Sequence, residues 1–309
     1  MTTLKAKYFN DDDAARKYLE GIRWPHGPVC PHCGTIGDHY QIRGKGGEKG
    51  TKARPGLYTC REKGCRKQFS VTVGTVFERS KIPLSKWLMA AYLLCSSKKG
   101  ISAHQLHRIM GVTYKTAWFL AHRIRHAMET KPKGLLGSGG GVVEADETYI
   151  GRKTGKPMGR AGWGHKNTVV SLVERGGELR SFHVSGSLFD NVKGILKGVS
   201  PDARLSTDEA TLYWKLGKQF KEHLTVLHKR DEYVRGDAHV NTLEGYFSIF
   251  KRGMKGVYQH CQSKHLHRYL AEFDFRYNHR ASLGIEDGQR VVDTLKGIGG
   301  KRLTYRSAG

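Results

Sequence analysis

The chain has 309 residues, of which 53 are lysine or arginine and 28 are aspartate or glutamate, so its formal net charge is +25 at pH 7. No apolar run approaches the roughly 20 residues of a membrane-spanning helix, and the opening MTTLKAKYFNDDD lacks the apolar core of a signal peptide; we therefore expect no membrane partner and a cytoplasmic, nucleoid-associated protein. Such an excess of cations is typical of proteins that neutralise nucleic-acid phosphates, with a ribosomal-type basic protein as the alternative.

The chain begins with a short predicted helix. Residues 11–24, DDDAARKYLEGIRW, place aspartates at the start and Gly21 near the end, which is the pattern of a capped helix. We assign residues 1–25 to this N-terminal helical part.

Four cysteines follow in two pairs: Cys30, Cys33, Cys60 and Cys65. In an intracellular chain such pairs favour metal ligation over disulfides, and four thiolates suit tetrahedral Zn²⁺. Aromatic and β-branched residues around the second pair and in QFSVTVGTVF suit a small antiparallel sheet. We therefore predict a zinc ribbon over residues 26–80 with one structural Zn²⁺. Unrelated free cysteines are the alternative, and His26, His32 and His39 are candidate substitute ligands.

Three helical patterns occupy residues 81–130 and are separated by Gly100 and Gly111. The second break has the length and the glycine turn of a helix-turn-helix. A helical bundle that only packs is the alternative. The last helix carries residues that suit a DNA groove and its phosphates: Tyr114, Lys115 and Arg123.

A change of pattern follows the glycine-rich segment KPKGLLGSGGG, residues 131–141, which we predict to be a linker. Beyond it come three strands, a helix, a strand, a helix, a strand and a helix, with a hairpin around Gly176. This order predicts a mixed-sheet α/β domain over residues 142–285. We expect Asp146 within its first strand and Asp208 at the C-terminal end of its fourth, where ligands gather in α/β sheets.

The last helix of that order has apolar residues at a spacing of three and four: Val240, Leu243, Phe247 and Phe250. Glu244 and Lys251 are seven residues apart, about two turns, so both project from one side of the helix.

Further along, a helical pattern carries predicted core residues: Tyr269, Leu270, Phe273 and Tyr277. We expect residues 286–309 to form a loose polar tail. Cys95 and Cys261 stand alone in apolar patterns that read as helical, and we predict a buried thiol at each.

Three acids from distant parts of the chain are thus candidates for one site: Asp146, Asp208 and Glu244. Carboxylates held together repel one another unless cations intervene, and hard oxygen ligands suit Mg²⁺ or Mn²⁺. Two such ions can activate an attacking oxygen and stabilise a leaving one in phosphoryl transfer. Neighbouring acids are alternatives: Glu144, Glu147, Glu209 and Asp237.

Three motifs around these acids resemble those of insertion-sequence transposases that join an N-terminal zinc ribbon to an RNase H-like DDE domain. They are DETYIG at 146–151, STDEA at 206–210, and HVNTLEGYFSIFKRGMKGVYQH from residue 239, with HLHRYLAEFDFRYNHR after it. The 35 residues between Asp208 and Glu244, and the basic residue Lys251, are similar to that family's pattern as well. The resemblance covers about residues 15–285.

The resemblance implies a DNA transposase that cuts transposon ends and joins the freed 3′-OH to target DNA, acting as a homo-oligomer on paired ends. It implies two Mg²⁺ or Mn²⁺ ions, both bridged by Asp146, with Asp208 and Glu244 holding one each. Some relatives use Asn or His at the third catalytic position, so Asn241 is our second choice for it.

Basic residues near these acids are predicted DNA contacts. Lys251 and Arg252 would hold a phosphate, and the glycine-rich loop at 151–166 would contribute Arg152, Lys153, Arg160 and Lys166. An ordinary flexible loop is the alternative. Two other functions stay open: a DNA-binding regulator whose RNase H-like domain is only a scaffold, and a nuclease of this fold that lacks the joining step.

Overall fold

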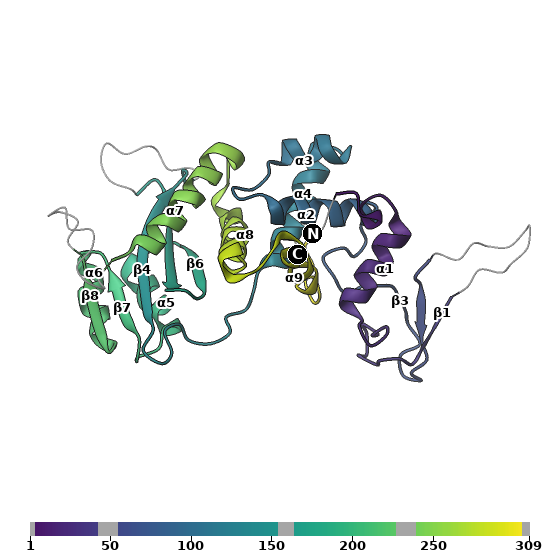
Figure 1. Ribbon diagram of the computed structural model, residues 1–309, viewed down its shortest axis with the longest axis horizontal. Coiled ribbons are helices and arrows are strands. Elements are labelled where there is room, and N and C mark those ends of the chain that lie inside the picture. The colour runs from purple at the N-terminus through teal and green to yellow at the C-terminus, as the bar shows by residue number, and fades with distance from the viewer. Residues whose placement is uncertain (1–3, 43–54, 154–163, 227–238, 305–309) are drawn as a thin grey trace, which may run out of the picture. The chain divides into compact units, whose positions relative to one another are not determined.

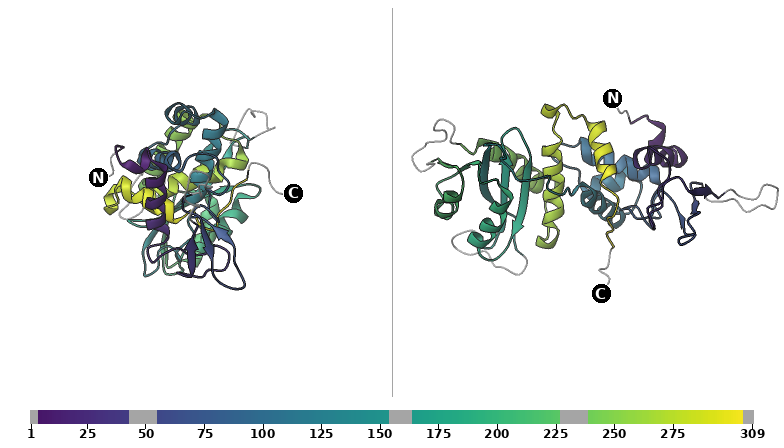
Figure 2. Two further views of the ribbon diagram at one scale, coloured as in Figure 1. Left: turned by 90° about the vertical axis from the view of Figure 1, so that its right-hand side faces the viewer. Right: turned by 90° about the horizontal axis from the view of Figure 1, so that it is seen from below.

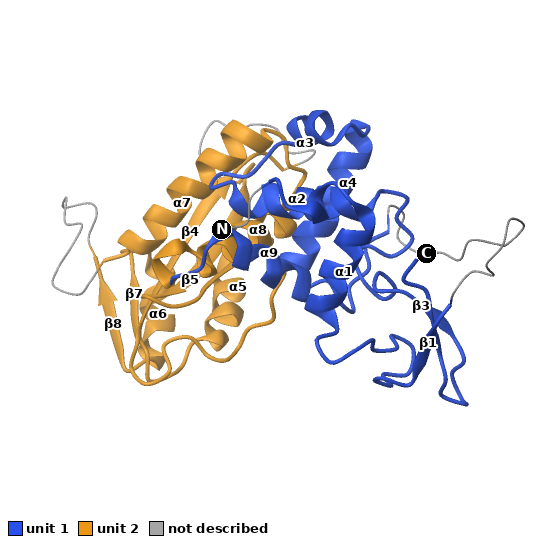
Figure 3. Ribbon diagram, turned by 45° about the vertical axis from the view of Figure 1, so that its right-hand side comes forward, with its two compact units in different colours: residues 1–128, 284–309 blue, residues 129–283 orange. Residues whose placement is uncertain are grey.

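The computed structural model describes residues 4–42, 55–153, 164–226 and 239–304. They form two compact units, coloured separately in Figure 3: unit 1 comprises residues 1–128 and 284–309, and unit 2 comprises residues 129–283. In the described ranges, every helix is too short or too polar to cross a bilayer.

Unit 1 is built on helices: α1 (Asp12–Arg23), α2 (Leu84–Ser96), α3 (Ala103–Met110), α4 (Tyr114–Met128) and α9 (Asp287–Lys296), with a 3-10 turn at Lys7–Phe9. The first helix begins as its aspartates predict, because the Asp11 side chain accepts hydrogen bonds from the amides of Asp13 and Ala14. Helix α2 packs against α1, α4 and α9, and these apolar contacts form the helical core of the unit (Figure 1).

The prediction of a loose tail after residue 286 is wrong for its first part. Helix α9 buries Val291, Thr294 and Leu295 against the other helices of unit 1. Its apolar residues recur at helical spacing, but they are few, and their partners are the remote helices α1, α2 and α4. The C-terminal region is therefore part of the core of unit 1.

The cysteine region contains a three-stranded antiparallel sheet of β1 (His39–Gln41), β2 (Tyr58–Cys60) and β3 (Gln68–Phe69). The predicted small sheet is thus present, but the stretch QFSVTVGTVF contributes only its first two residues to it. After Phe69 the chain forms turns that bury Val71, Val76 and Phe77.

Helices α3 and α4 have the predicted turn at Gly111, which adopts the left-handed conformation (φ 58°) that glycine tolerates best. Of the two lone cysteines, Cys95 is fully buried in α2, as predicted. The prediction for Cys261 is wrong, because this residue is only half-buried and lies outside any helix.

Unit 2 is organised around a five-stranded sheet: β4 (Val142–Ile150), β5 (Asn167–Glu174), β6 (Leu179–Val184), β7 (Arg204–Thr207) and β8 (Glu222–Thr225). The spatial order is β6-β5-β4-β7-β8. Strands β4, β5 and β6 form an antiparallel meander, whereas β7 and β8 run parallel to β4. The predicted combination of zinc ribbon, helical region and mixed α/β sheet is therefore confirmed.

Helices cover both faces of this sheet: α5 (Leu188–Ile195), α6 (Thr211–Leu216), α7 (Asn241–Gly253) and α8 (Leu266–Asn278). Short turns complete the unit: 3-10 turns at Leu196–Gly198, Gly217–Gln219, Ser263–His265 and Ala281–Leu283, and a π-helical turn at Met254–Tyr258. Helices α5 and α6 pack with Val143 and Ala145 of β4 on one face. Helices α7 and α8 pack with Ile150 on the other (Figure 1), and the right-hand view of Figure 2 shows α8, in yellow-green, alongside the sheet. Because side chains alternate along a strand, odd and even residues of β4 face different helices.

The predicted linker at 131–141 is partly folded structure. Leu136 is 2% exposed and belongs to the core beneath α5 and α6. Its amide donates to the carbonyl of Gly198, and its own carbonyl accepts from the amide of Ser200. Gly137 has φ 72°, and a Cβ there would lie 2.5 Å from that of Ala203, so this position requires glycine.

Candidate functional site

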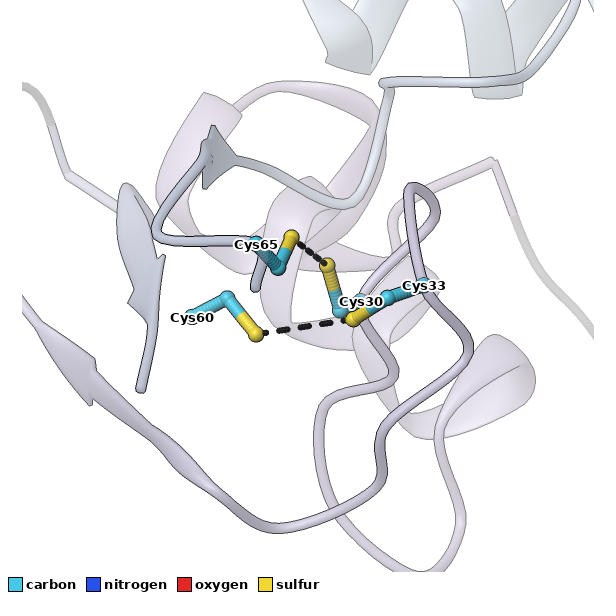
Figure 4. Close-up of side chains that lie close together, drawn as sticks. All are labelled: Cys30, Cys33, Cys60 and Cys65. Atoms are coloured by element: carbon cyan, nitrogen blue, oxygen red, sulfur yellow. Dashed lines mark hydrogen bonds between the residues drawn. The ribbon is translucent and has the colours of Figure 1, made fainter. Parts of the chain in front are cut away.

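The four cysteines of unit 1 converge in the ribbon (Figure 4). The Sγ atoms of Cys30 and Cys65 lie 3.7 Å apart and those of Cys33 and Cys60 lie 3.6 Å apart. Four sulfurs at 2.3 Å from a tetrahedral Zn²⁺ would be about 3.8 Å from each other. The set therefore matches a zinc centre, and His26, His32 and His39 are not among its members.

The first pair lies on a tight turn, in which the Gly34 amide donates to the Cys30 carbonyl. Contacts with Thr35 lower the pKa of Cys33 to about 6, whereas burial raises the pKa of Cys60 to about 12. Two thiols as unequal in acidity as those of Cys33 and Cys60 would both be ionised at neutral pH only beside a cation, because a metal stabilises each thiolate.

The acids Asp146 and Asp208 are brought together by the register of β4 and β7. Glu144 pairs with Ser206 and Ala145 pairs with Thr207 in this parallel ladder. Asp208 directly follows the last residue of β7. If the register is continued by this one residue, Asp146 lies beside Asp208, and neighbouring strands are about 4.8 Å apart. Two residues 62 positions apart in the chain thus become neighbours at the point where β7 ends.

Alternation along β4 separates the neighbouring acids. Glu147 lies on the face of α6, where its carboxylate accepts a hydrogen bond of 3.0 Å from the hydroxyl of the buried Tyr213. Glu144 and Asp146 lie on the opposite face, which α7 covers. Glu244 is in the first turn of α7.

The three acids interact electrostatically. Burial first, and then the charges of Asp208, Glu147 and Glu244, together raise the pKa of Asp146 to about 8, against one hydrogen bond from the Glu147 amide that lowers it. Asp146 therefore holds a proton at neutral pH unless a cation replaces it. This is the behaviour expected of a carboxylate in a cation site, and the hard oxygen donors fit Mg²⁺ or Mn²⁺.

The acids are not packed as tightly as the cysteines. Within the described ranges, the cysteines are the one group of three or more His, Cys, Asp or Glu residues whose ligand atoms all lie within 4.8 Å of one another. Glu244 and Asn241 are both exposed at the start of α7, and Lys251 is half-buried two turns beyond Glu244. The charge of Glu244 acts on Asp146, whereas Asn241 is neutral.

Glu144 has a role that the spacing of motifs did not reveal. Its carboxylate is fully buried and accepts hydrogen bonds from Arg175, from Thr242 and from the amide of Leu243. Thr242 and Leu243 are in the first turn of α7. A charged residue inside a buried strand is the one sequence signal that could have pointed to such a partner.

Two family models match this chain. Residues 138–278 match the ISXO2-like transposase domain, and residues 10–68 match the transposase zinc-ribbon domain. The chain thus joins a transposase zinc ribbon to an ISXO2-like transposase domain. A protein of Halobacterium salinarum, described as an uncharacterized protein in transposable element ISH50, is 28% identical to this transposase over 307 residues, which span 93% of this chain and 98% of that protein.

The transposase exposes some of its predicted DNA contacts and buries one. Tyr114 and Lys115 are exposed at the start of α4. Arg123 is only 6% exposed, donates 2.8 Å to the Glu78 carbonyl and lies over the rings of Trp87 and Phe119. We therefore correct the prediction for Arg123, because its guanidinium is engaged in the interior of unit 1.

Around the acids, Arg152 and Arg252 are exposed, whereas Lys153, Lys166 and Lys251 are half-buried. The Lys153 amide donates to the His165 carbonyl and so joins the two ends of the predicted DNA-binding loop. Arg160 and the alternative acid Asp237 lie outside the described residues.

Proposed function

We propose that this transposase cuts the phosphodiester at a transposon end and joins the freed 3′-OH to target DNA. The observation that carries the proposal is the register of β4 with β7, which brings Asp146 beside Asp208, while the charge of Glu244 acts on Asp146 from α7. These acids come from two strands and a helix that are distant in the chain. A protein of net charge +25 does not need three acids on neighbouring elements in order to be soluble, so their placement calls for another explanation.

In this proposal Asp146, Asp208 and Glu244 hold two Mg²⁺ or Mn²⁺ ions. Ions bound there would activate the attacking water or 3′-OH and stabilise the leaving oxygen. A cation held there would take the place of the proton that burial and the neighbouring acids favour on Asp146. The side chain of Lys251 would position a phosphate of the bound DNA.

The rest of the chain would hold the DNA. The zinc ribbon and helices α3 and α4 are the proposed end-recognition region, with Tyr114 and Lys115 contacting a groove. We retain the predicted six-part division of the chain as part of this proposal, with α9 now a helix of unit 1. A homo-oligomer on paired ends is the proposed active form.

The test uses the purified protein and duplex oligonucleotides that carry the inverted repeats flanking its gene. In Mg²⁺, the wild type should nick the repeat end, and with pre-cleaved ends it should join the 3′-OH to a plasmid. D146N should lose at least about 10³-fold of both activities and keep its DNA affinity. E147Q is the matched control, since this neighbour faces α6, and it should stay within about tenfold of the wild type.

Three outcomes would redirect the assignment. Full activity in D146N would leave the protein a DNA-binding regulator on an RNase H-like scaffold. Cleavage without joining of pre-cleaved ends would leave it a nuclease. Equal loss in E147Q and D146N would mean that the wrong face of β4 has been assigned to the chemistry.

A further inference from the structure

We propose that Glu144 is a positioning residue that fixes the first turn of α7, and with it Glu244, relative to Asp146. The inference rests on the proposed function, since it takes Asp146, Asp208 and Glu244 as the metal-binding acids. It also removes Glu144 from the alternative ligands, although Glu144 lies only two residues from Asp146 on the same face of β4.

Both oxygens of Glu144 already have partners. Oε1 accepts from the Nε of Arg175 and from the Oγ1 of Thr242, each at 2.8 Å, and lies 3.3 Å from the Nδ1 of His239. Oε2 accepts from the amide of Leu243 at 3.1 Å. With the side chain 0% exposed, binding a cation would require breaking several of these bonds.

The amide of Leu243 explains why this carboxylate matters to the helix. The first amides of any helix lack partners within it, and a side chain of the N-cap residue usually accepts from one of them. In α7 the N-cap is Val240, which offers no side-chain hydrogen bond. Glu144 takes over this function from the neighbouring strand, and its charge also complements the helix dipole.

A second layer of bonds ties the same region to β7. The carbonyl of His239, just before α7, accepts from the Nη2 of Arg175 at 2.9 Å and from the Oγ of Ser206 at 2.8 Å. Ser206 is the register partner of Glu144. The strands β4 and β7, the β5–β6 hairpin and the start of α7 thus meet in one hydrogen-bonded group.

Each acid of the site lies two residues after a member of this group. Asp146 follows Glu144, Asp208 follows Ser206, and Glu244 follows Thr242. We define Glu144, Ser206 and Thr242, together with Arg175 and the His239 carbonyl, as the anchor group. Through it, the positions of three acids from distant segments depend on one buried carboxylate.

Residues that orient metal ligands typically change metal affinity by 10- to 100-fold when they are replaced. E144Q keeps the shape of Glu144 but loses its charge. Only the oxygen of its amide can accept hydrogen bonds, whereas both carboxylate oxygens of Glu144 accept them. We expect E144Q to weaken Mn²⁺ binding by about tenfold or more. T242V, which removes a single donor and keeps the branched shape, should weaken it by about two- to fivefold.

The experiment measures Mn²⁺ alone, without DNA, by electron paramagnetic resonance of the free ion against the zinc-loaded full chain. Hydrogen exchange of peptides covering residues 240–246 is the second readout, and it should rise in E144Q. The matched control is E272Q, because Glu272 is also fully buried and ion-paired to an arginine, Arg276, but on α8. E272Q should lower Tm and leave Mn²⁺ affinity within about twofold.

The inference is overturned if E144Q binds Mn²⁺ as tightly as the wild type, or if E272Q weakens binding as much as E144Q at equal loss of Tm. D146N separates this failure from a failure of the proposed function. If D146N also binds Mn²⁺ normally, the acids are not the cation site at all. If D146N loses Mn²⁺ and E144Q does not, the site stands and only the anchoring role of Glu144 is wrong.

Discussion

In the ribbon of unit 1, four cysteines bring their ligand atoms within 4.8 Å of one another, whereas Asp146, Asp208 and Glu244 of unit 2 do not meet that distance as a set. The difference follows from the chemistry of the two groups. Neutral thiols can pack together without a metal, and protonated cysteines cost little to bury. Carboxylates repel one another, so a protein can only hold them near each other by fixing the backbone that carries them.

The two sites are also supported differently. The cysteines lie on short turns and strands, such as the turn closed by the Gly34 amide and the Cys30 carbonyl. The acids depend on the register of β4 with β7 and on the anchor group beneath α7. The cysteine site thus matches a centre that stabilises a small fold, while the proposed role of the acid site is to receive cations and DNA.

The largest expected effect breaks the cysteine site. Structural zinc contributes on the order of 10 kcal/mol to the folding of small ribbons, so C60S should lose its zinc and unfold residues 26–80. Unit 2 should keep its Mn²⁺ affinity. Atomic absorption for zinc and limited proteolysis of the ribbon measure the effect, with C95S, at a buried thiol of unit 1 outside the cysteine cluster, as the control. A C60S protein with stoichiometric zinc and a protected ribbon would contradict the assignment.

Removing a ligand from the acid site should instead leave the fold intact. D208N is expected to reduce Mg²⁺-dependent strand cleavage by at least about 10³-fold, equivalent to roughly 4 kcal/mol of transition-state stabilisation, with unchanged zinc content. The adjacent acid provides the control, and E209Q should cleave within about tenfold of the wild type. Comparable losses in both variants would show that Asp208 has no special role.

The stability of the acid site should depend on pH. Because the pKa of Asp146 is about 8 in the folded protein and its ordinary value is 3.8, the folded state retains a proton that the unfolded state has lost between these values. Without divalent metal, stability should therefore fall as pH rises from about 4 to about 8. In EDTA at pH 8, D146N should raise the free energy of unfolding of unit 2 by roughly 1–3 kcal/mol.

Thermal denaturation at two pH values checks this expectation. At pH 5, where Asp146 is neutral in the folded state, D146N and the wild type should melt much closer together. A D146N protein that is equally destabilised at both pH values would mean that the burial of Asp146 has been misjudged.

The smallest expected effect concerns DNA. Lys251 shares a side of α7 with Glu244, so K251A should weaken duplex binding by about 1 kcal/mol and reduce the slope of log affinity against log salt by about one. Fluorescence anisotropy over a salt series measures both. Lys221 is the control. It is exposed just before β8, at the opposite end of the parallel strands from Asp208. An identical slope change in K221A would indicate a general charge effect.

Several elements could be predicted from local pattern alone. The apolar spacing from Val240 to Phe250 predicted α7, and the aspartates at 11–13 predicted the start of α1. Hydrophobic periodicity and helix capping depend on residues close together in the sequence, so they can be recognised without knowing the tertiary structure. The two cysteine pairs could be recognised from the sequence for the same reason.

Other features depended on partners far away in the chain. The apolar residues of α9 are buried only by packing against remote helices such as α1 and α2, so from the sequence its region was predicted to be a tail. Leu136 was predicted to be part of a linker, although backbone hydrogen bonds with Gly198 and Ser200 fix it in the core. Arg123 was predicted to be a DNA contact, although its guanidinium lies over the ring of Trp87 and donates to the Glu78 carbonyl.

By itself, the sequence determined which residues are the candidates for the chemistry: four cysteines in two pairs, and acids at the strand and helix positions that the hydrophobic pattern marks. Tertiary structure alone decided what neighbouring acids do. Glu144, Asp146 and Glu147 lie within four residues, yet one anchors α7, one meets Asp208 and one binds Tyr213 on the opposite face. The physical reason is that a strand fixes only the alternation of its side chains, while the register with β7 and the helices on each face decide what each side chain meets.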